Sequence, residues 1–296
     1  MKVVILGAGA GGGSPQWNCR CPVCALAWAH DIRVKRRTQV GFAVSMDGTR
    51  WILFNCSPDI REQIAKSPFL QPLAPRDSPI CGIVLTSGDV DHIGGLLCLR
   101  EGHRFDLHAT AAIHAILDRN PIFRVLDPSV VNRITVEPDR RFRLEGGIEI
   151  TVFVTSGKAP LYLEGEPEGT VLGTTFGIEV ATGRAPFFYV PACADIDTRL
   201  ADRLRNAALV FFDGTLWTDE EMIRLGISSK TGRRMGHMPV AGEDGSLARL
   251  RALGVSRLIY IHINNTNPMQ VEGSPEHAAV LAAGAEVGFD GQEVLL

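Results

Sequence analysis

The chain has 296 residues, of which 45% are hydrophobic and 21% are charged, a composition typical of a globular protein with its own core. The formal net charge of −3 argues against nucleic acid as a general partner, because sequence-independent binding needs a strongly basic surface. The sequence has no uninterrupted apolar run of about 18 residues, so we expect no transmembrane helix. Met1 to Gly7 is too short and glycine-rich for a signal peptide, and we therefore expect a cytoplasmic protein.

Strand-like and helix-like segments follow one another along the chain. Runs of β-branched and aromatic residues predict strands at 3–6, 40–44, 51–54, 83–86, 148–154, 174–180, 186–190, 208–212 and 258–261. Helices are predicted at 57–66, 92–101, 109–118, 197–205, 247–253 and 274–283. The first half is rich in strands, both halves end in alternating strands and helices, and no flexible linker separates them. We expect one domain over residues 1–296, an αββα sandwich of two sheets with helices outside.

A glycine-rich loop, residues 7–15, follows the first predicted strand. Alone it resembles a dinucleotide-binding loop, but such a loop opens directly into a helix whose N-terminus meets the pyrophosphate. Here Pro15, Trp17 and a group of cysteines come next. That order favours a turn that leads into a cysteine-rich, metal-binding loop at about residues 17–25.

Three cysteines of this loop, Cys19, Cys21 and Cys24, lie within six positions. In a reducing compartment, three thiolates so close together predict a tetrahedral structural zinc site. A redox or catalytic role is the weaker alternative, because two thiols normally suffice for it.

The segment Leu85 to Leu96 places chemistry at the end of a strand. An apolar strand ends, a short polar loop carries Asp91 and His92, and the Gly94-Gly95 pair opens a helix. Asp91 and His92 therefore lie at the carboxyl end of a strand, where α/β proteins place their sites, and they can offer an oxygen and a nitrogen to one metal ion. The alternative is a helix cap beside a surface histidine.

This segment resembles the metallo-β-lactamase fold, whose usual motif is His-x-His-x-Asp-His. The chain retains the last two positions of that motif, but Ser87 and Asp89 replace the two leading histidines. The departure speaks against a standard two-zinc hydrolase, because those histidines help to hold the first metal ion. By the same resemblance, Asp213 matches the bridging aspartate and His262 matches the final histidine ligand.

The candidate metal ligands that this chain retains are Asp91, His92 and His262. Asp213 is either a further ligand or a residue that supports the ligands from behind. Two histidines and one carboxylate with open positions are the pattern of non-haem Fe(II) oxygen chemistry. We therefore predict one Fe(II) ion, or zinc in the protein as isolated; a decayed, metal-free site is the alternative. The resemblance also concerns the cysteine site. In phosphodiesterases of this fold, a histidine completes a similar cysteine cluster, and the matching position in this chain is Asn265. Asn265, a water or a remote group is the fourth ligand.

Charged residues of two loops are candidates for substrate binding. Lys230, Arg233 and Arg234 suit a ligand with carboxylates, since arginine binds them in bidentate fashion; a solvated loop is the alternative. Lys158 follows a predicted strand and can reach the cleft. His237 is a candidate for proton transfer or a third metal histidine.

The remaining histidines carry no such pattern. We expect them at the surface rather than in a metal site: His30, His103, His108, His114 and His277.

Seven motifs taken together resemble the coenzyme PQQ biosynthesis protein B family over the whole chain. They are Gly11–Cys21, Ser57–Arg61, Gly88–His92, Gly157–Glu164, Phe212–Trp217, Lys230–His237 and His262–Pro268. The resemblance implies a role in making pyrroloquinoline quinone (PQQ), as an iron-dependent hydroxylase of the tyrosine ring in a crosslinked Glu–Tyr precursor. Carriage of PQQ or a precursor to the periplasm, and hydrolysis by analogy with the fold, are the alternatives.

On the hydroxylase interpretation, Asp89 and His237 move protons, while Ser87, Lys158 and the basic loop contact the precursor, a small molecule or short peptide with several carboxylates. Other enzymes of the pathway and a second copy of the chain, as a homodimer, are further partners that the sequence leaves open.

Overall fold

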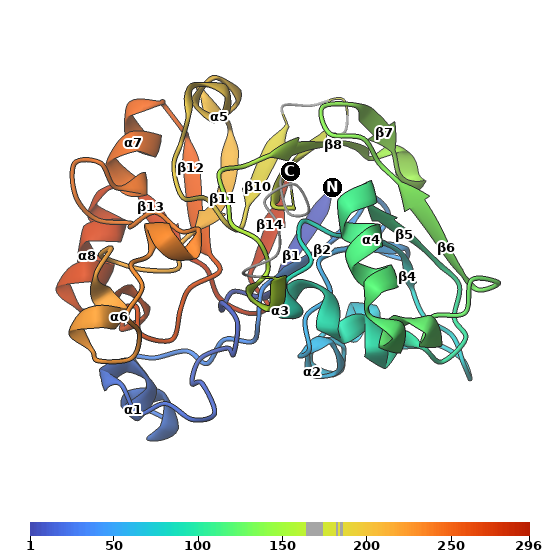
Figure 1. Ribbon diagram of the computed structural model, residues 1–296, viewed down its shortest axis with the longest axis horizontal. Coiled ribbons are helices and arrows are strands. Elements are labelled where there is room, and N and C mark those ends of the chain that lie inside the picture. The colour runs from blue at the N-terminus through green and yellow to red at the C-terminus, as the bar shows by residue number, and fades with distance from the viewer. Residues whose placement is uncertain (164–173, 182, 184–185) are drawn as a thin grey trace.

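The computed structural model describes residues 1–163, 174–181, 183 and 186–296. Two mixed β-sheets face each other, and helices cover their outer faces (Figure 1). This arrangement confirms the predicted αββα sandwich. Glu164, the last residue of one sequence motif, lies outside the described residues.

The first sheet comes mainly from the N-terminal half, but its edge strand is the C-terminal end of the chain. Antiparallel pairing joins β14, β1, β2 and β3, and parallel pairing continues through β4, β5 and β6. In sheet order, the strands are β14 (Glu293–Leu295), β1 (Lys2–Gly7), β2 (Gly41–Ser45), β3 (Trp51–Phe54), β4 (Ile80–Val84), β5 (Phe105–Ala109) and β6 (Val131–Thr135).

The second sheet is built from the C-terminal half and from strands that follow β6. Its central strands β10, β11 and β12 are apolar and almost wholly buried, as expected for strands covered on both faces. In sheet order, the strands are β13 (Ala285–Val287), β12 (Arg257–Ile261), β11 (Leu209–Asp213), β10 (Phe187–Val190), β9 (Phe176–Ala181), β8 (Glu149–Val154) and β7 (Arg141–Arg143).

Aromatic side chains fill the space between the sheets. The ring of Phe42 on β2 stacks on Phe54 with a centroid distance of 4.3 Å. It also contacts, edge to face, Tyr189 at 4.7 Å and Phe211 at 5.7 Å on the opposite sheet. Because these rings are fully buried, they hold the sheets in a fixed relation, and with them the strand ends that carry the site.

Helices pack on the outside of both sheets. Leu200, Leu204, Leu250 and Val280 on three of them join a buried cluster with β10–β13. The helices are α1 (Pro22–Trp28), α2 (Ile60–Lys66), α3 (Val90–Ile93), α4 (Ala111–Arg119), α5 (Thr198–Leu204), α6 (Glu221–Arg224), α7 (Ser246–Ala252) and α8 (Pro275–Ala282). Among the described residues, no helix has the length and apolar character needed to cross a bilayer.

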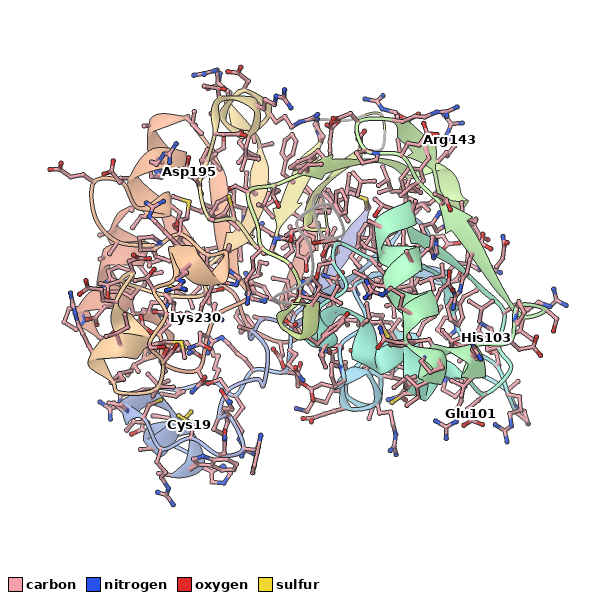
Figure 2. All side chains as sticks on the ribbon, in the orientation of Figure 1. Cys19, Glu101, His103, Arg143, Asp195 and Lys230 are labelled. Atoms are coloured by element: carbon pink, nitrogen blue, oxygen red, sulfur yellow. The ribbon has the colours of Figure 1, made fainter. Side chains whose placement is uncertain are left out.

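The cysteine-rich segment projects beside the second sheet and has a small core of its own. Figure 2 shows Cys19 in this projection, at the lower left. Val23, Cys24, Ala27 and Val34 are buried there, and Val34 forms an isolated β-bridge with Val271.

Several sequence predictions differ from the structure. The helix predicted over 92–101 begins earlier, at Val90, and its α-helical part ends at Ile93. Asp91 and His92 therefore lie in its single turn rather than in a loop before Gly94-Gly95, and Gly94–Leu99 continues as a 3-10 helix. The sequence reading omitted β5, β6, β7, β13 and β14, which are short or rich in polar residues. His108 and His114, expected at the surface, are buried at 6% and 8% exposure because β5 and α4 place them against the core.

Candidate metal centre

The candidate site lies where four segments meet at the carboxyl ends of strands. Asp91 and His92 follow β4, Asp213 ends β11, and His262 directly follows β12. His237 comes from the loop after a short 3-10 turn, Arg233–Met235. These segments border a cavity of about 320 Å³, whose lining includes Gly11, Gln16, Asp89, Asp91, His92, Lys158, Thr215, Met222, Met235, His237, His262 and Asn264.

Asp91, His92 and His262 converge at the cavity as predicted metal ligands should. Oδ2 of Asp91 lies 3.1 Å from Nε2 of His262 and 3.8 Å from Nε2 of His92. One ligand atom from each residue lies within 4.8 Å of the other two. Nε2 of His92 is buried and has no hydrogen-bond partner in the described part of the chain. A buried nitrogen without a partner is costly, and a metal ion would satisfy it, so the residues fit a metal ion.

Hydroxyl groups behind His92 fix which of its nitrogens carries the proton. Ser87 Oγ lies 2.7 Å from Nδ1 of His92 and donates its own hydrogen to Asp89 Oδ2 at 2.8 Å. Thr86 Oγ1, 3.2 Å from the same Nδ1, donates to Asn55 Oδ1. Both hydroxyl hydrogens are thus used elsewhere, so Nδ1–H of His92 is the donor and Nε2 keeps its lone pair for a metal ion.

The electrostatics of the three residues suit a cation. Burial lowers the pKa of His92, which favours the neutral form that binds metal. Burial acts to raise the pKa of Asp91, but the charges of His92 and His262 outweigh it and hold that pKa well below its usual range. For His262, burial acts to lower the pKa, but the hydrogen bond and charge of Asp91 and the charge of Asp213 outweigh it, so the pKa lies above its usual value. Asp91 is therefore a carboxylate at neutral pH.

Asp213, the second predicted carboxylate, lies on the other side of the His262 ring. Its Oδ1 is 4.0 Å from Nδ1 of His262, whereas Asp91 faces Nε2. Oδ2 of Asp213 accepts hydrogen bonds from Nδ1 of His237 at 2.7 Å and from the Cys193 amide at 3.0 Å. Asp213 is fully buried and does not line the cavity. Asp213 therefore lies outside the cavity lining, beside Nδ1 of His262 rather than Nε2.

Thr215 also belongs to the candidate site, although the sequence analysis did not single it out. Its hydroxyl lies 2.6 Å from Oδ1 of Asp213, 2.8 Å from Nδ1 of His262 and 3.1 Å from Nδ1 of His237. In the sequence, only its position two residues after the aspartate that ends a strand could have indicated that Thr215 lies in the site.

The predicted substrate-binding residues lie at different distances from the cavity. Lys158 lines it, and its backbone and side chain pack closely against Gly236, where a Cβ would lie only 3.0 Å from Lys158 Cγ. Ser87 is 1% exposed and faces His92. Arg233 donates to the carbonyl of Ala194, and its side chain points away toward Asp195, which Figure 2 labels at the upper left.

Arg234 is exposed and Lys230 half-buried, and neither is among the described residues that line the cavity. Figure 2 shows Lys230 in the half of the molecule that contains β11 and β12. The roles proposed for these two residues and for Arg233 remain predictions.

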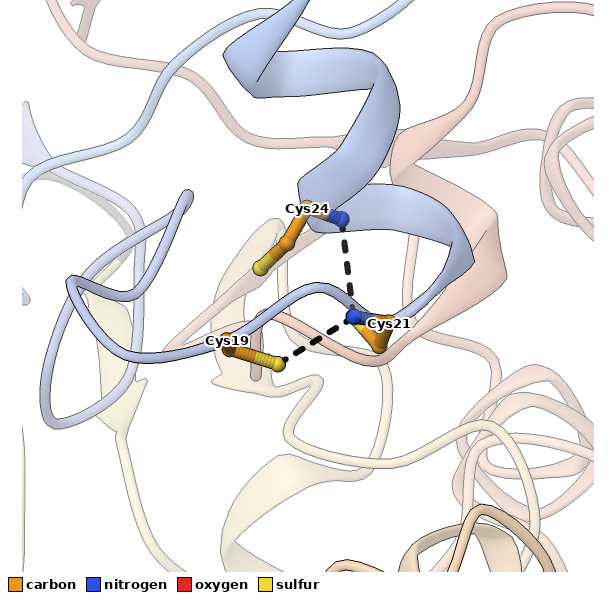
Figure 3. A group of neighbouring side chains, drawn as sticks. All are labelled: Cys19, Cys21 and Cys24. Atoms are coloured by element: carbon orange, nitrogen blue, oxygen red, sulfur yellow. Dashed lines mark hydrogen bonds between the residues drawn. The ribbon is translucent and has the colours of Figure 1, made fainter.

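The three cysteines of the N-terminal loop form a second candidate site. Figure 3 shows Cys19, Cys21 and Cys24 around one point, and their sulfur atoms lie within 4.8 Å of one another. Backbone amides donate to two of the sulfurs, from Cys21 to Cys19 and from Cys24 to Cys21, each at 3.4 Å. Burial raises the pKa of the Cys21 thiol to about 12, a penalty that binding a cation removes.

Asn265 completes the surroundings of the cysteines. Its side-chain amide lies 3.2 Å from Sγ of Cys24, and its backbone carbonyl lies 3.4 Å from Sγ of Cys21. Asn265, one of the three candidates for the fourth ligand, lies beside the sulfurs, and its role as a ligand remains a prediction. The next residue toward β12, Asn264, lines the cavity of the histidine site.

Comparison with known proteins identifies the family. The sequence profile described as "Beta-lactamase superfamily domain" matches residues 50–263. "Coenzyme PQQ synthesis protein B" of Rhizobium meliloti (strain 1021) is 51% identical over 299 residues, covering 100% of this chain and 98% of its own. This chain belongs to the coenzyme PQQ synthesis protein B family. The protein of the same name from Xanthomonas campestris pv. campestris (strain B100) is 47% identical, with both chains covered completely.

Solved structures agree with membership of the PQQ synthesis protein B family. The crystal structure of Zn²⁺-bound PqqB from Methylobacterium extorquens matches with a TM-score of 0.95 and 46% identity, and both chains are covered completely. A diphosphatase of the PhnP family matches with a TM-score of 0.70 at 20% identity, covering 99% of this chain and 96% of its own. The second match shows the shared fold alone. Membership supports a role in PQQ biosynthesis, and the clustered ligands together with the zinc-bound relative support a metal cofactor.

Proposed function

We propose that this chain is a metal-dependent oxygenase of PQQ biosynthesis that hydroxylates the tyrosine ring of the crosslinked Glu–Tyr precursor. The observation that best supports this proposal is that Asp91, His92 and His262 converge on one point of the cavity. Nε2 of His92 is buried there and has no hydrogen-bond partner among the described residues. Two histidines and one carboxylate are the ligand set of non-haem Fe(II) oxygenases. We therefore propose Fe(II) in this centre, with zinc taking its place in the protein as isolated.

Asp91, His92 and His262 would hold the ion, and the ion would supply the activation of O2. Ser87 holds His92 in the tautomer that leaves Nε2 free. Asp89, which lines the cavity and accepts from Ser87, is placed to take a proton from a phenol bound there, as is His237 across the cavity. Lys158, a cation in the described part of the lining, would pair with a precursor carboxylate.

The apolar side chains of Ala192, Met222 and Met235 in the cavity lining support an aromatic substrate. Thioether side chains make favourable contacts with aromatic rings and adapt to their shape. A tyrosine-derived ring in the cavity would therefore meet thioether groups as well as Asp91, His92 and His262.

Hydrolysis is less well supported. Ser87 and Asp89 replace the two histidines that the fold's two-zinc hydrolases use, and the hydroxyl of Ser87 is bonded to His92 rather than exposed in the cavity. The N-terminal cysteines serve a separate purpose in this proposal: Cys19, Cys21 and Cys24, with Asn265, would hold a structural zinc.

The test is the mass of the product. Protein purified without oxygen and loaded with Fe(II) is incubated in air with the crosslinked Glu–Tyr compound and ascorbate, because inserting one oxygen atom from O2 while reducing the other to water consumes two electrons. We expect a gain of oxygen in the product that is lost without iron and in His92→Ala. An unchanged mass with folded, loaded protein would overturn the proposal, and tight PQQ binding by metal-free protein would then favour a carrier.

A further inference from the structure

The hydroxyl of Thr215 lies at the centre of a second group of metal-binding residues. Asp213, His237 and His262 present ligand atoms within 4.8 Å of one another, on the far side of the His262 ring from Asp91. Taken as residue types alone, these side chains and the Asp91 group would form a site for two metal ions that share His262. Thr215 Oγ1, however, lies within 3.1 Å of a ligand atom of all three residues.

The hydrogen atoms around Thr215 can be assigned from the distances. A threonine hydroxyl has one hydrogen, and two oxygens that can only accept compete for it, Asp213 Oδ1 at 2.6 Å and the His262 backbone carbonyl at 2.9 Å. Nδ1 of His262, 2.8 Å from the same hydroxyl, must then donate its own hydrogen to Thr215 Oγ1. Nδ1 of His237 lies 2.7 Å from Asp213 Oδ2, which can only accept, so this nitrogen is also a donor.

Two consequences follow for metal binding. Both Nδ1 atoms of the second group carry hydrogen and cannot ligate, whereas Nε2 of His262 faces Asp91 Oδ2 at 3.1 Å and is the nitrogen that a metal ion at Asp91 would take in place of a hydrogen. In addition, zinc bonds nitrogen and oxygen at about 2.0–2.2 Å, so an ion bound to all three residues of the second group would collide with Thr215 Oγ1.

We propose that Thr215 is a positioning residue that limits this centre to one metal ion. Its hydroxyl holds His262 in the Nδ1–H tautomer for the ion at Asp91 and His92, and it occupies the space between Asp213, His237 and His262. Asp213 acts through Thr215 rather than as a ligand. The inference rests on the metal-binding part of the proposed function and is independent of the reaction catalysed.

The test measures the binding of zinc without substrate or turnover. A negative result for the role of Thr215 is therefore distinguishable from a negative result in the oxygenase assay. Thr215→Val keeps the shape of the side chain and removes the hydroxyl, while Thr215→Ser is the matched control that retains it. Zinc affinity is measured by competition with a chromophoric chelator, and stoichiometry by native mass spectrometry. Loss of a group that orients a histidine ligand typically weakens metal binding about 10- to 100-fold, which we expect for Thr215→Val, with Thr215→Ser close to wild type.

The stoichiometry tests the second half of the proposal. We expect wild-type protein to bind one zinc ion more than His262→Ala, which removes the histidine that both groups share, and two ions more would overturn the proposal. Wild-type affinity in folded Thr215→Val would also overturn it.

If Thr215→Val does not fold, the tautomer of His262 can still be measured in the wild-type protein. In the zinc-loaded protein, ¹⁵N NMR of the imidazoles, with His262 assigned by comparison with His262→Gln, must show a protonated Nδ1 and a zinc-bound Nε2. Zinc on Nδ1 of His262 would refute the inference.

Discussion

Replacing Ser87 with alanine separates two roles for this residue, orienting a metal ligand or binding the substrate. Ser87 Oγ accepts from Nδ1 of His92 at 2.7 Å and donates to Asp89. Ser87→Ala removes the acceptor and should let the His92 ring change its tautomer or rotate. We therefore expect weaker binding of the metal ion.

The size of the loss follows from what remains around the ring. Removing a group that orients a metal ligand typically costs about 10- to 100-fold in affinity. Thr86 Oγ1 stays 3.2 Å from Nδ1 of His92 and can still accept its hydrogen. The expected loss for Ser87→Ala is therefore at the lower end, about tenfold or about 1.4 kcal/mol. Adding Thr86→Val removes the second acceptor and should bring the loss to about 100-fold.

Zinc affinity is measured by chelator competition, and folding by circular dichroism. Ser57→Ala is a matched control, because Ser57 is equally buried and its hydroxyl has no hydrogen-bond partner within the described residues. We expect Ser57→Ala to bind zinc as wild type does. If Ser87→Ala binds zinc normally and instead raises KM for the precursor, the assignment is refuted and Ser87 is a substrate contact.

Two further predictions concern the cysteine site and the buried histidines. Cys21→Ser should lower the melting temperature and remove one zinc ion per chain, while the ion at the histidine centre persists; loss of the latter ion alone would contradict separate roles for the sites. Burial lowers the pKa values of His108 and His114, so the folded state resists their protonation, and stability should be full above about pH 6.5 and fall below it. The double variant His108→Phe/His114→Gln should lose less stability than wild type between pH 7.5 and 5.5 in urea titrations; an equal loss would show that these histidines do not contribute.

Much of the fold was predictable because its central strands are continuous apolar runs. Strand β3 was predicted with its correct bounds, and β11 and β12 were placed to within one residue. Strand β14 could not be predicted locally, because three residues become a strand there only by pairing with β1 at the other end of the chain. The polar residues of β6 likewise conceal a strand that parallel pairing with β5 creates.

The candidate ligands were predictable only in part, for a similar reason. Asp91 and His92 stand in a recognisable motif, and the family resemblance pointed to His262 and Asp213. The sequence shows that Asp213 ends a strand, but it does not show which side of the His262 ring the carboxylate faces. The sequence therefore could not decide whether Asp213 binds the metal ion directly or supports a ligand. Charge suggested that Arg233 contacts the substrate, but the sequence could not show that its guanidinium donates to the backbone carbonyl of Ala194.

The most direct test of the account is an anomalous-scattering map of crystals of the zinc-loaded protein, recorded at the zinc edge. The account predicts one peak bonded to Asp91, His92 and His262, at about 2.0–2.2 Å from their ligand atoms, and another at the cysteine cluster. A peak bonded to Asp213, or the absence of a peak at His92 in zinc-saturated crystals, would contradict it.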